Sequence, residues 1–259
     1  MSDRLVLLGT GTCQLQEHRV ASSALIELAD LRLVFDFGRG VATRLAALGL
    51  AQDDVGHVAL SHFHVDHVSD LVPYLHAGSW SGIDPRTRDL HVWGPEGLEA
   101  LMGGMFELFD GLLRDDGFGV DLHEVVGDSM TIEGREFRLA DLPPSGNRGL
   151  KFVAGDVTCA LTGDSHFHEQ EVDFLRGADI AVIDAGHPSD DEIVELASRC
   201  GARKLVCSHL YRDLDRDTLA RRAAARGFGG EIIVGEDLMT FDLSRGIAGI
   251  GPSGPRRRA

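Results

Sequence analysis

The sequence predicts an α/β fold in which two β-sheets pack against each other and helices cover the outside. Apolar runs typical of strands come in groups, helical patterns separate only some of them, and no linker-like segment interrupts the chain. With 259 residues, 43% of them hydrophobic, the chain can build a sizeable core. We therefore expect one domain over residues 1–244 and a flexible Gly/Pro/Arg tail over residues 245–259.

The first half of the chain begins with strands and then alternates strands with helices. Two of the strands flank Asp30 and are predicted to form a hairpin. The predicted strands are Leu5–Leu8, Ser23–Leu28, Leu31–Asp36, His57–Ser61 and Leu90–Trp93. The predicted helices are Val41–Leu48 before Gly49, Val68–Leu75 by its apolar spacing, and one opened by Gly94–Gly97 that runs to about Leu113.

The second half repeats this arrangement, and its strands are apolar runs bounded by turn residues. The predicted strands are Val120–Val126, Glu136–Ala140, Gly149–Ala154, Val157–Leu161, Ile180–Ile183, Leu205–Cys207, Glu231–Val234 and Leu238–Asp242. The predicted helices are Glu169–Arg176, Asp190–Cys200 and Arg216–Arg226.

Composition narrows the class of protein. The formal net charge is −16, which disfavours a large nucleic-acid footprint because phosphate contacts require Lys and Arg. Four scattered cysteines without CxxC spacing indicate reduced thiols, so we expect a cytoplasmic protein. Neither a signal peptide nor an apolar run long enough to span a membrane is indicated.

The segment His62-Phe63-His64-Val65-Asp66-His67 predicts a metal site. It places three imidazoles and a carboxylate within six residues, directly after a predicted strand. In an extended segment His62 and His64 point to the same side, while Asp66 and His67 open the following helix. Neutral imidazole plus carboxylate suits zinc, iron or manganese better than calcium or magnesium.

Two further candidates, Asp164 and His209, follow predicted strands and so would lie at strand ends. Together with the histidine motif, and in this order, they resemble the metallo-β-lactamase superfamily over residues 4 to about 243. Three other segments resemble its ribonuclease Z-like branch: they are Leu7–Thr12, Phe35–Gly40 and Val92–Leu98.

This resemblance implies an αβ/βα sandwich, two central mixed sheets flanked by helices, with metals at one edge between the sheets. It implies that His62 and His64 bind a first metal, that Asp66, His67 and His209 bind a second, and that Asp164 bridges the two. The expected cofactor is zinc, as one or two ions, with manganese or iron as alternatives.

One departure from the family pattern affects the first metal. The family supplies a further histidine before the bridging aspartate, and in this sequence Pro143 stands nearest that place. The first site is then weak or empty, or Asp141, His166 or His168 replaces the missing ligand. For His166 and His168 the competing interpretation is a polar loop at the start of a helix.

The predicted chemistry is hydrolysis of a small ester by a metal-bound hydroxide, with a phosphodiester slightly favoured. The catalytic candidates are Asp66, which would orient the water, and His187, in a segment similar to the family's GHxS; a helix-capping region is the equal alternative for His187. The alternatives are a thioester or lactone hydrolase, and a degenerate metal- or ligand-binding protein. The expected partners are a small-molecule ester and, in a homodimer, a second copy of the chain, but no membrane and no large nucleic acid.

Overall fold

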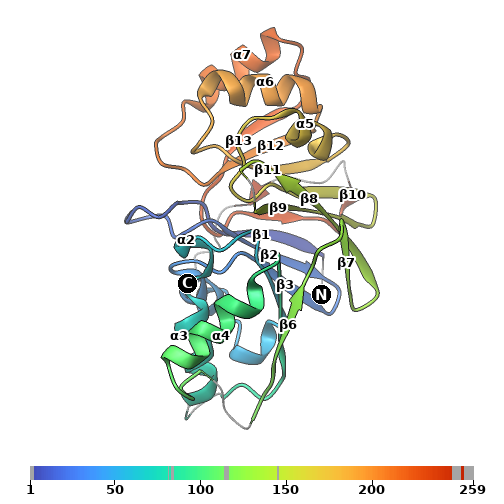
Figure 1. Ribbon diagram of the computed structural model, residues 1–259. Coiled ribbons are helices and arrows are strands. Elements are labelled where there is room, and N and C mark those ends of the chain that lie inside the picture. The colour runs from blue at the N-terminus through green and yellow to red at the C-terminus, as the bar shows by residue number, and fades with distance from the viewer. Residues whose placement is uncertain are drawn as a thin grey trace.

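The computed structural model describes residues 3–80, 82, 85–113, 117–144, 146–246 and 252–253. Two β-sheets pack face to face, and helices cover the outer face of each (Figure 1). Eight strands form one sheet in the order β15-β14-β1-β2-β3-β4-β5-β6, and seven form the other in the order β13-β12-β11-β10-β9-β8-β7. The predicted fold class, an αβ/βα sandwich, is therefore confirmed.

The sheets mix parallel and antiparallel pairs: β2–β3 is a hairpin, whereas β3–β4–β5–β6 and β10–β11–β12–β13 run parallel. The strands of the first sheet are β1 (Arg4–Gly9), β2 (Ser23–Leu28), β3 (Leu31–Phe35), β4 (His57–Ala59), β5 (Leu90–Gly94), β6 (Val120–Glu124), β14 (Thr240–Asp242) and β15 (Pro252–Ser253). The strands of the second sheet are β7 (Ser129–Ile132), β8 (Arg135–Leu142), β9 (Asn147–Ala154), β10 (Val157–Leu161), β11 (Ile180–Asp184), β12 (Lys204–Ser208) and β13 (Glu231–Val234).

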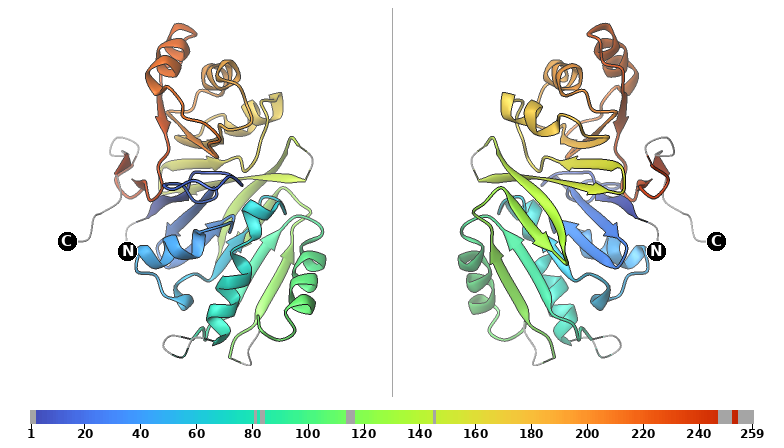
Figure 2. Two further views of the ribbon diagram at one scale, coloured as in Figure 1. Left: turned by 90° about the vertical axis from the view of Figure 1, so that its left-hand side faces the viewer. Right: turned by 90° about the vertical axis from the view of Figure 1, so that its right-hand side faces the viewer.

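Helices from the two halves of the chain cover opposite outer faces, as both side views show (Figure 2). The first sheet carries α1 (Val41–Ala47), α2 (Val65–Val68), α3 (Leu71–Trp80) and α4 (Leu98–Leu108), and the 3-10 turn Gln52–Asp54 precedes β4. The second sheet carries α5 (Glu169–Leu175), α6 (Asp190–Cys200) and α7 (Arg216–Ala225).

Strand β1 explains why its sequence is apolar without alternation. Leu5 and Leu7 face the core between the sheets, whereas Val6 and Leu8 face the helices. A strand buried on both faces needs apolar side chains at every position, so its sequence reads as a continuous hydrophobic run. The sheet–sheet core is completed by side chains such as Phe137, Phe152 and Phe241, all nearly inaccessible.

Three elements before the predicted tail differ from the sequence prediction. The helix expected over Val68–Leu75 is two helices, α2 and α3, because the Asp70 amide donates to the Phe37 carbonyl at the break. Strand β7 was not predicted, since only two of its four residues are buried. Helix α4 ends at Leu108, short of Leu113.

Among the described residues, no helix is long and apolar enough to cross a membrane. The tail predicted over residues 245–259 lies mostly outside the described residues. Two of its residues, Pro252 and Ser253, pair with β14.

Candidate metal centre

The predicted ligands gather where strands end. His62 and His64 follow β4, Asp66 and His67 lie on the short helix α2, Asp164 follows β10, and His209 follows β12. Parallel neighbours bring their carboxyl ends to one edge, so residues far apart in sequence converge there. The described residues form three overlapping groups with potential ligand atoms within 4.8 Å of one another: His62, His64 and Asp164; Asp66, His67 and His209; and Asp164, Asp184, His187 and His209.

Asp164 lies between the histidines of the first two groups, and each of its oxygens faces one side. Oδ1 is 3.0 Å from His67 Nε2 and 3.2 Å from His209 Nε2. Oδ2 is 3.7 Å from His62 Nε2. A carboxylate in this position can bridge two cations, one on each side.

The remaining contacts define which side is enclosed. Asp66 Oδ2 lies 3.5 Å from His209 Nε2 and 3.9 Å from His67 Nε2, and both imidazoles are buried. The ring of His64 meets that of His62 edge-on with centroids 4.4 Å apart, and His64 is exposed. The group of Asp66, His67 and His209 is therefore the enclosed one, and the group of His62 and His64 opens to solvent.

The donor atoms fit a bound divalent cation. The inward-facing atoms His62 Nε2, His67 Nε2, His209 Nε2 and Asp164 Oδ1 are buried and have no hydrogen-bond partner. Buried polar atoms without partners cost free energy, so their convergence on one volume indicates a ligand that satisfies them. Ligands about 2.0–2.1 Å from a tetrahedral zinc ion lie roughly 3.3 Å apart, which matches the spacings around Asp164.

The protonation of the imidazoles also suits a cation. Burial and the neighbouring His67 lower the pKa of His62 to about 4, so its lone pair is free. Burial opposes charge on His209, but contacts with Asp184 and Asp66 and the charge of Asp164 raise the pKa of His209 to about 9. Without metal, the proton held by His209 thus partly offsets the negative charge of the surrounding carboxylates. A divalent ion supplies that positive charge instead, and its binding releases protons.

Two buried aspartates that were not singled out as site residues orient these histidines. Asp36 Oδ2 accepts hydrogen bonds from His67 Nδ1 at 2.8 Å and from Ser61 Oγ at 2.9 Å. Asp184 Oδ1 lies 3.5 Å from His209 Nδ1. Each carboxylate therefore faces the outer nitrogen and leaves Nε2 to face inward. The sequence signal for both was their place at the end of a buried strand.

Backbone conformation at the site is unusual. Asp36 and His209 both adopt left-handed φ values, 62° and 52°, which non-glycine residues seldom do. Such conformations persist where the surrounding contacts fix them, and they gather at functional sites. Gly38 shows a related constraint, because a Cβ there would lie 1.6 Å from the carbonyl oxygen of Asp66.

His187 lies beside the enclosed group. Its Nδ1 is 2.6 Å from Asp184 Oδ2, and its ring stacks on that of His209 with centroids 5.2 Å apart. The hydrogen bond to Asp184 outweighs partial burial and raises the pKa of His187. Helix α6 is capped by Ser189, whose side chain accepts from the Glu192 amide, so capping does not require His187.

Of the three residues considered as a replacement ligand near Pro143, two are occupied elsewhere. Asp141 is largely exposed and pairs with Arg148 at 2.9 Å. His168 caps α5, where its Nδ1 accepts from the Gln170 amide. His166 stacks on His187 with centroids 5.2 Å apart. None of the three joins a potential metal-binding group within the described residues.

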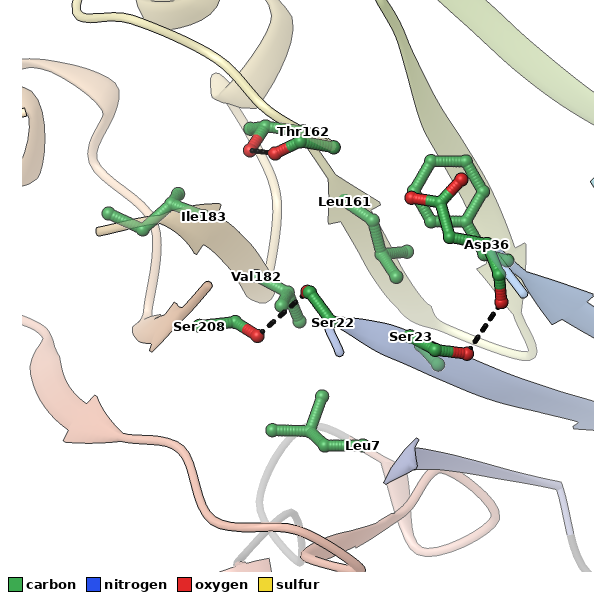
Figure 3. A pocket seen from close by; sticks show the side chains of 12 residues that line it. Leu7, Ser22, Ser23, Asp36, Leu161, Thr162, Val182, Ile183 and Ser208 are labelled. Atoms are coloured by element: carbon green, nitrogen blue, oxygen red, sulfur yellow. Dashed lines mark hydrogen bonds between the residues drawn. The ribbon is translucent and has the colours of Figure 1, made fainter. Parts of the chain in front are cut away.

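Hydroxyl groups line a small cavity between the sheets. Its volume is about 20 Å³, and its wall includes Asp36, Thr162 and Ser208. Figure 3 shows Ser22 pointing toward Ser208 and Ser23 pointing toward the backbone of Asp36; the corresponding hydrogen bonds are 3.2 and 2.7 Å long. The first bond links the residue before β2 to the end of β12, and the second links the start of β2 to Asp36, which follows β3.

Comparison with known proteins agrees with this geometry. The family model described as the metallo-beta-lactamase superfamily matches residues 18–209, a range that contains all six predicted ligands. The chain belongs to the metallo-beta-lactamase superfamily. As a member with converging histidines and aspartates, it is a metal-dependent hydrolase.

Similar proteins within the superfamily cover nearly the whole chain. Ribonuclease Z of Mycobacterium sp. (strain KMS) is 25% identical over 96% of this chain and 99% of its own. Ribonuclease Z of Mycobacterium marinum is 26% identical over 92% of this chain and 98% of its own. The resemblance to the ribonuclease Z-like branch is thereby confirmed.

Solved structures show the same fold. The metallo-beta-lactamase fold protein YhfI from Bacillus subtilis has a TM-score of 0.75 at 21% identity, covering 93% of this chain and 99% of that one. The short form of human tRNase Z has a TM-score of 0.69 at 19% identity, covering 93% of this chain and 99% of that one.

The comparisons correct one expectation. The sequence favoured a small-molecule ester and disfavoured a large nucleic acid, but curated relatives over the full length are named ribonuclease Z. The prediction of partners was wrong because a net charge of −16 is an average over the whole chain. Overall charge does not decide the substrate of a site whose bound cations would themselves attract phosphate.

Proposed function

We propose that the protein hydrolyses phosphodiester bonds, including those of RNA, with zinc as the bound metal and manganese or iron as alternatives. The observation that carries the proposal is the position of Asp164 between two groups of ligands, in a chain that resembles ribonuclease Z along its length. Two adjacent cations suit phosphoryl chemistry because one can serve the attacking oxygen and the other the leaving oxygen.

In this proposal His62 and His64 bind one ion, Asp66, His67 and His209 bind the other, and Asp164 bridges them. When bound, such ions lower the pKa of water toward neutrality and polarise phosphoryl oxygens. Asp66 lies at the rim of the enclosed group, its side chain 12% exposed, and its carboxylate can accept a hydrogen bond from the attacking water.

We assign His187 the role of proton donor to the leaving oxygen. Asp184 is bonded to Nδ1 and fixes the ring, which leaves Nε2 to carry the transferred proton. The side chain of His187 is 30% exposed, so substrate can reach it, and the ring lies against His209.

A panel of substrates tests the proposal. Purified protein is stripped with chelator, reloaded with zinc or manganese, and assayed on bis-p-nitrophenyl phosphate, labelled RNA, a thioester and a lactone. We expect metal-dependent cleavage of the two phosphodiesters. Turnover of the thioester or lactone without phosphodiesterase activity would refute the assignment of bond class.

The role of His187 has its own test. His187→Gln should lower turnover about 10²–10⁴-fold, as expected when a general acid is lost, while metal content stays unchanged. His18→Gln is the matched control, because the His18 side chain is 86% exposed and lies outside the site. Loss of metal in His187→Gln would show that His187 is a ligand instead.

A further inference from the structure

A buried serine hydroxyl connects a ligand of one proposed ion with the carboxylate that supports a ligand of the other. Ser61 follows β4, directly precedes His62 and is fully buried. Its Oγ lies 2.9 Å from Asp36 Oδ2 and 2.9 Å from His62 Nδ1. The same oxygen of Asp36 accepts from His67 Nδ1 at 2.8 Å. One carboxylate therefore reaches two imidazoles, His67 directly and His62 through the hydroxyl.

The single hydrogen of the Ser61 hydroxyl fixes the direction of each bond. A carboxylate only accepts hydrogen bonds, so Ser61 donates this hydrogen to Asp36. The contact with His62 then requires that Nδ1 carry a proton and donate it to Ser61 Oγ. A neutral imidazole has one such proton, so Nε2 keeps its lone pair. This Nε2 is buried without a hydrogen-bond partner among the described residues, 3.7 Å from Asp164 Oδ2.

Contacts from both sheets hold the hydroxyl in place. The Ser61 amide donates to Asp36 Oδ1 at 2.7 Å, and the Ser61 carbonyl accepts from the amide of Arg148 on β9 at 2.9 Å. Gly163, in the loop after β10, lies against the side chain, since a Cβ there would be 3.0 Å from Ser61 Oγ. Rotation of the hydroxyl away from Asp36 would leave a buried polar group unpaired, which costs free energy. The position of Ser61 Oγ is therefore well defined.

We propose that Ser61 is a positioning residue that relays the hydrogen-bond preference of Asp36 to His62. Asp36 then sets the metal-binding tautomer of an imidazole at each proposed ion, and the inference rests on the proposed assignment of His62 and His67 to different ions. In Ser61→Ala, Nδ1 of His62 loses its partner, so the ring proton is better placed on Nε2, which faces Asp164. Asp36 still accepts from His67 in this variant, so the effect should be confined to His62.

Nuclear magnetic resonance of the imidazole nitrogens tests the relay in the metal-free protein at neutral pH. Proton–nitrogen correlations distinguish the two tautomers of a neutral ring, and His62→Gln assigns the signals of His62. We expect the proton of His62 on Nδ1 in the wild type and on Nε2 in Ser61→Ala, while Nδ1 of His67 stays protonated in both. Ser69→Ala is the matched control, because the buried Ser69 Oγ has no hydrogen-bond partner among the described residues.

Chelator competition on the zinc-loaded protein measures the consequence for metal binding. The ion that is missing in His64→Gln identifies the one bound by His62. Ser61→Ala should weaken this ion about 10–100-fold and leave the affinity for the other unchanged. Asp36→Asn should weaken both ions, because Asp36 supports His62 and His67 alike.

The tautomer of His62 decides the proposal. A proton on Nε2 in the wild type, a proton that stays on Nδ1 in Ser61→Ala, or an equal change in Ser69→Ala overturns it. The wild-type measurement remains decisive if Ser61→Ala misfolds. A wild-type protein without bound zinc or phosphodiesterase activity would instead contradict the proposed function, since the tautomer measurement requires neither.

Discussion

Replacing Asp36 with asparagine should weaken metal binding although Asp36 is not a ligand. The carboxylate accepts three hydrogen bonds: Oδ1 from the Ser61 amide at 2.7 Å, and Oδ2 from Ser61 Oγ at 2.9 Å and from His67 Nδ1 at 2.8 Å. Asparagine retains one accepting oxygen. If that oxygen keeps the Ser61 amide, its NH₂ group faces His67 Nδ1, and two donors then oppose each other.

The consequence reaches the metal through the tautomer of His67. To relieve the opposition, the proton of the ring moves to Nε2, the nitrogen that faces Asp164. A protonated Nε2 cannot bind a metal. Before His67 of the variant can coordinate a metal, its ring proton must return from Nε2 to Nδ1. Loss of such a supporting carboxylate costs about 10–100-fold in metal affinity, or roughly 1.4–2.8 kcal/mol. The lost charge-assisted hydrogen bond should also lower the free energy of unfolding of the metal-free protein by about 1.5–3 kcal/mol.

Competition with a chelator of known affinity measures the first effect, and urea unfolding of the metal-free protein measures the second. Asp70→Asn is the matched control, since Asp70 Oδ2 accepts only from the Ala42 amide among its side-chain contacts in the described structure and does not contact His67. Wild-type metal affinity in Asp36→Asn would refute the tautomer argument. An equal loss of affinity in Asp70→Asn would attribute the effect to general charge.

Three further changes test other parts of the account. Gly38→Ala should destabilise the protein by at least about 3 kcal/mol and release metal, because the added Cβ would overlap the Asp66 carbonyl. Gly56→Ala is the control and should do neither, since a Cβ there has nothing within 4 Å. Normal metal content in Gly38→Ala would refute this prediction. Burial raises the pKa of Glu171 from its ordinary 4.5 to about 8, so the folded state binds this proton more tightly than the unfolded state. This proton's contribution to the free energy of unfolding is complete below pH 4.5, and on the order of 4 kcal/mol of it is lost as pH rises through 8. The free energy of unfolding of Glu171→Gln should not show this loss. Identical pH profiles for variant and wild type would contradict the prediction. Calorimetric titration of metal-free protein with zinc should show one tight and one weaker ion. The ion at His62 and His64 would have three protein ligands including the shared Asp164, whereas the ion at Asp66, His67 and His209 would have four including it. Two equal affinities would contradict this.

The sequence was sufficient for the fold class, and the structure brings together the local part of the predicted metal site. His62, His64, Asp66 and His67 lie within six residues, so their convergence follows from local geometry alone. Asp164 and His209 lie at strand ends, and the order of these residues was needed to connect them with the motif. Strand ends are readable from apolar runs, which is why these predictions were within reach.

Other features depend on contacts that no local pattern reports. Asp36 reaches His67 across 31 positions, and its part in the site appears only when β3 and α2 are side by side. The break between α2 and α3 arises from the bond between Asp70 and Phe37, a tertiary contact that overrides helical periodicity. The net charge did not predict the class of substrate because it is an average over the whole chain.

Replacing the residue between the two ligand groups tests the central claim most directly. Metal per chain and cleavage of bis-p-nitrophenyl phosphate are measured on the same samples of wild type, Asp164→Ala and Asp141→Ala, the last being an exposed aspartate outside both groups. We predict that Asp164→Ala loses metal and phosphodiesterase activity together, while Asp141→Ala retains both. Wild-type metal content and turnover in Asp164→Ala would contradict the account.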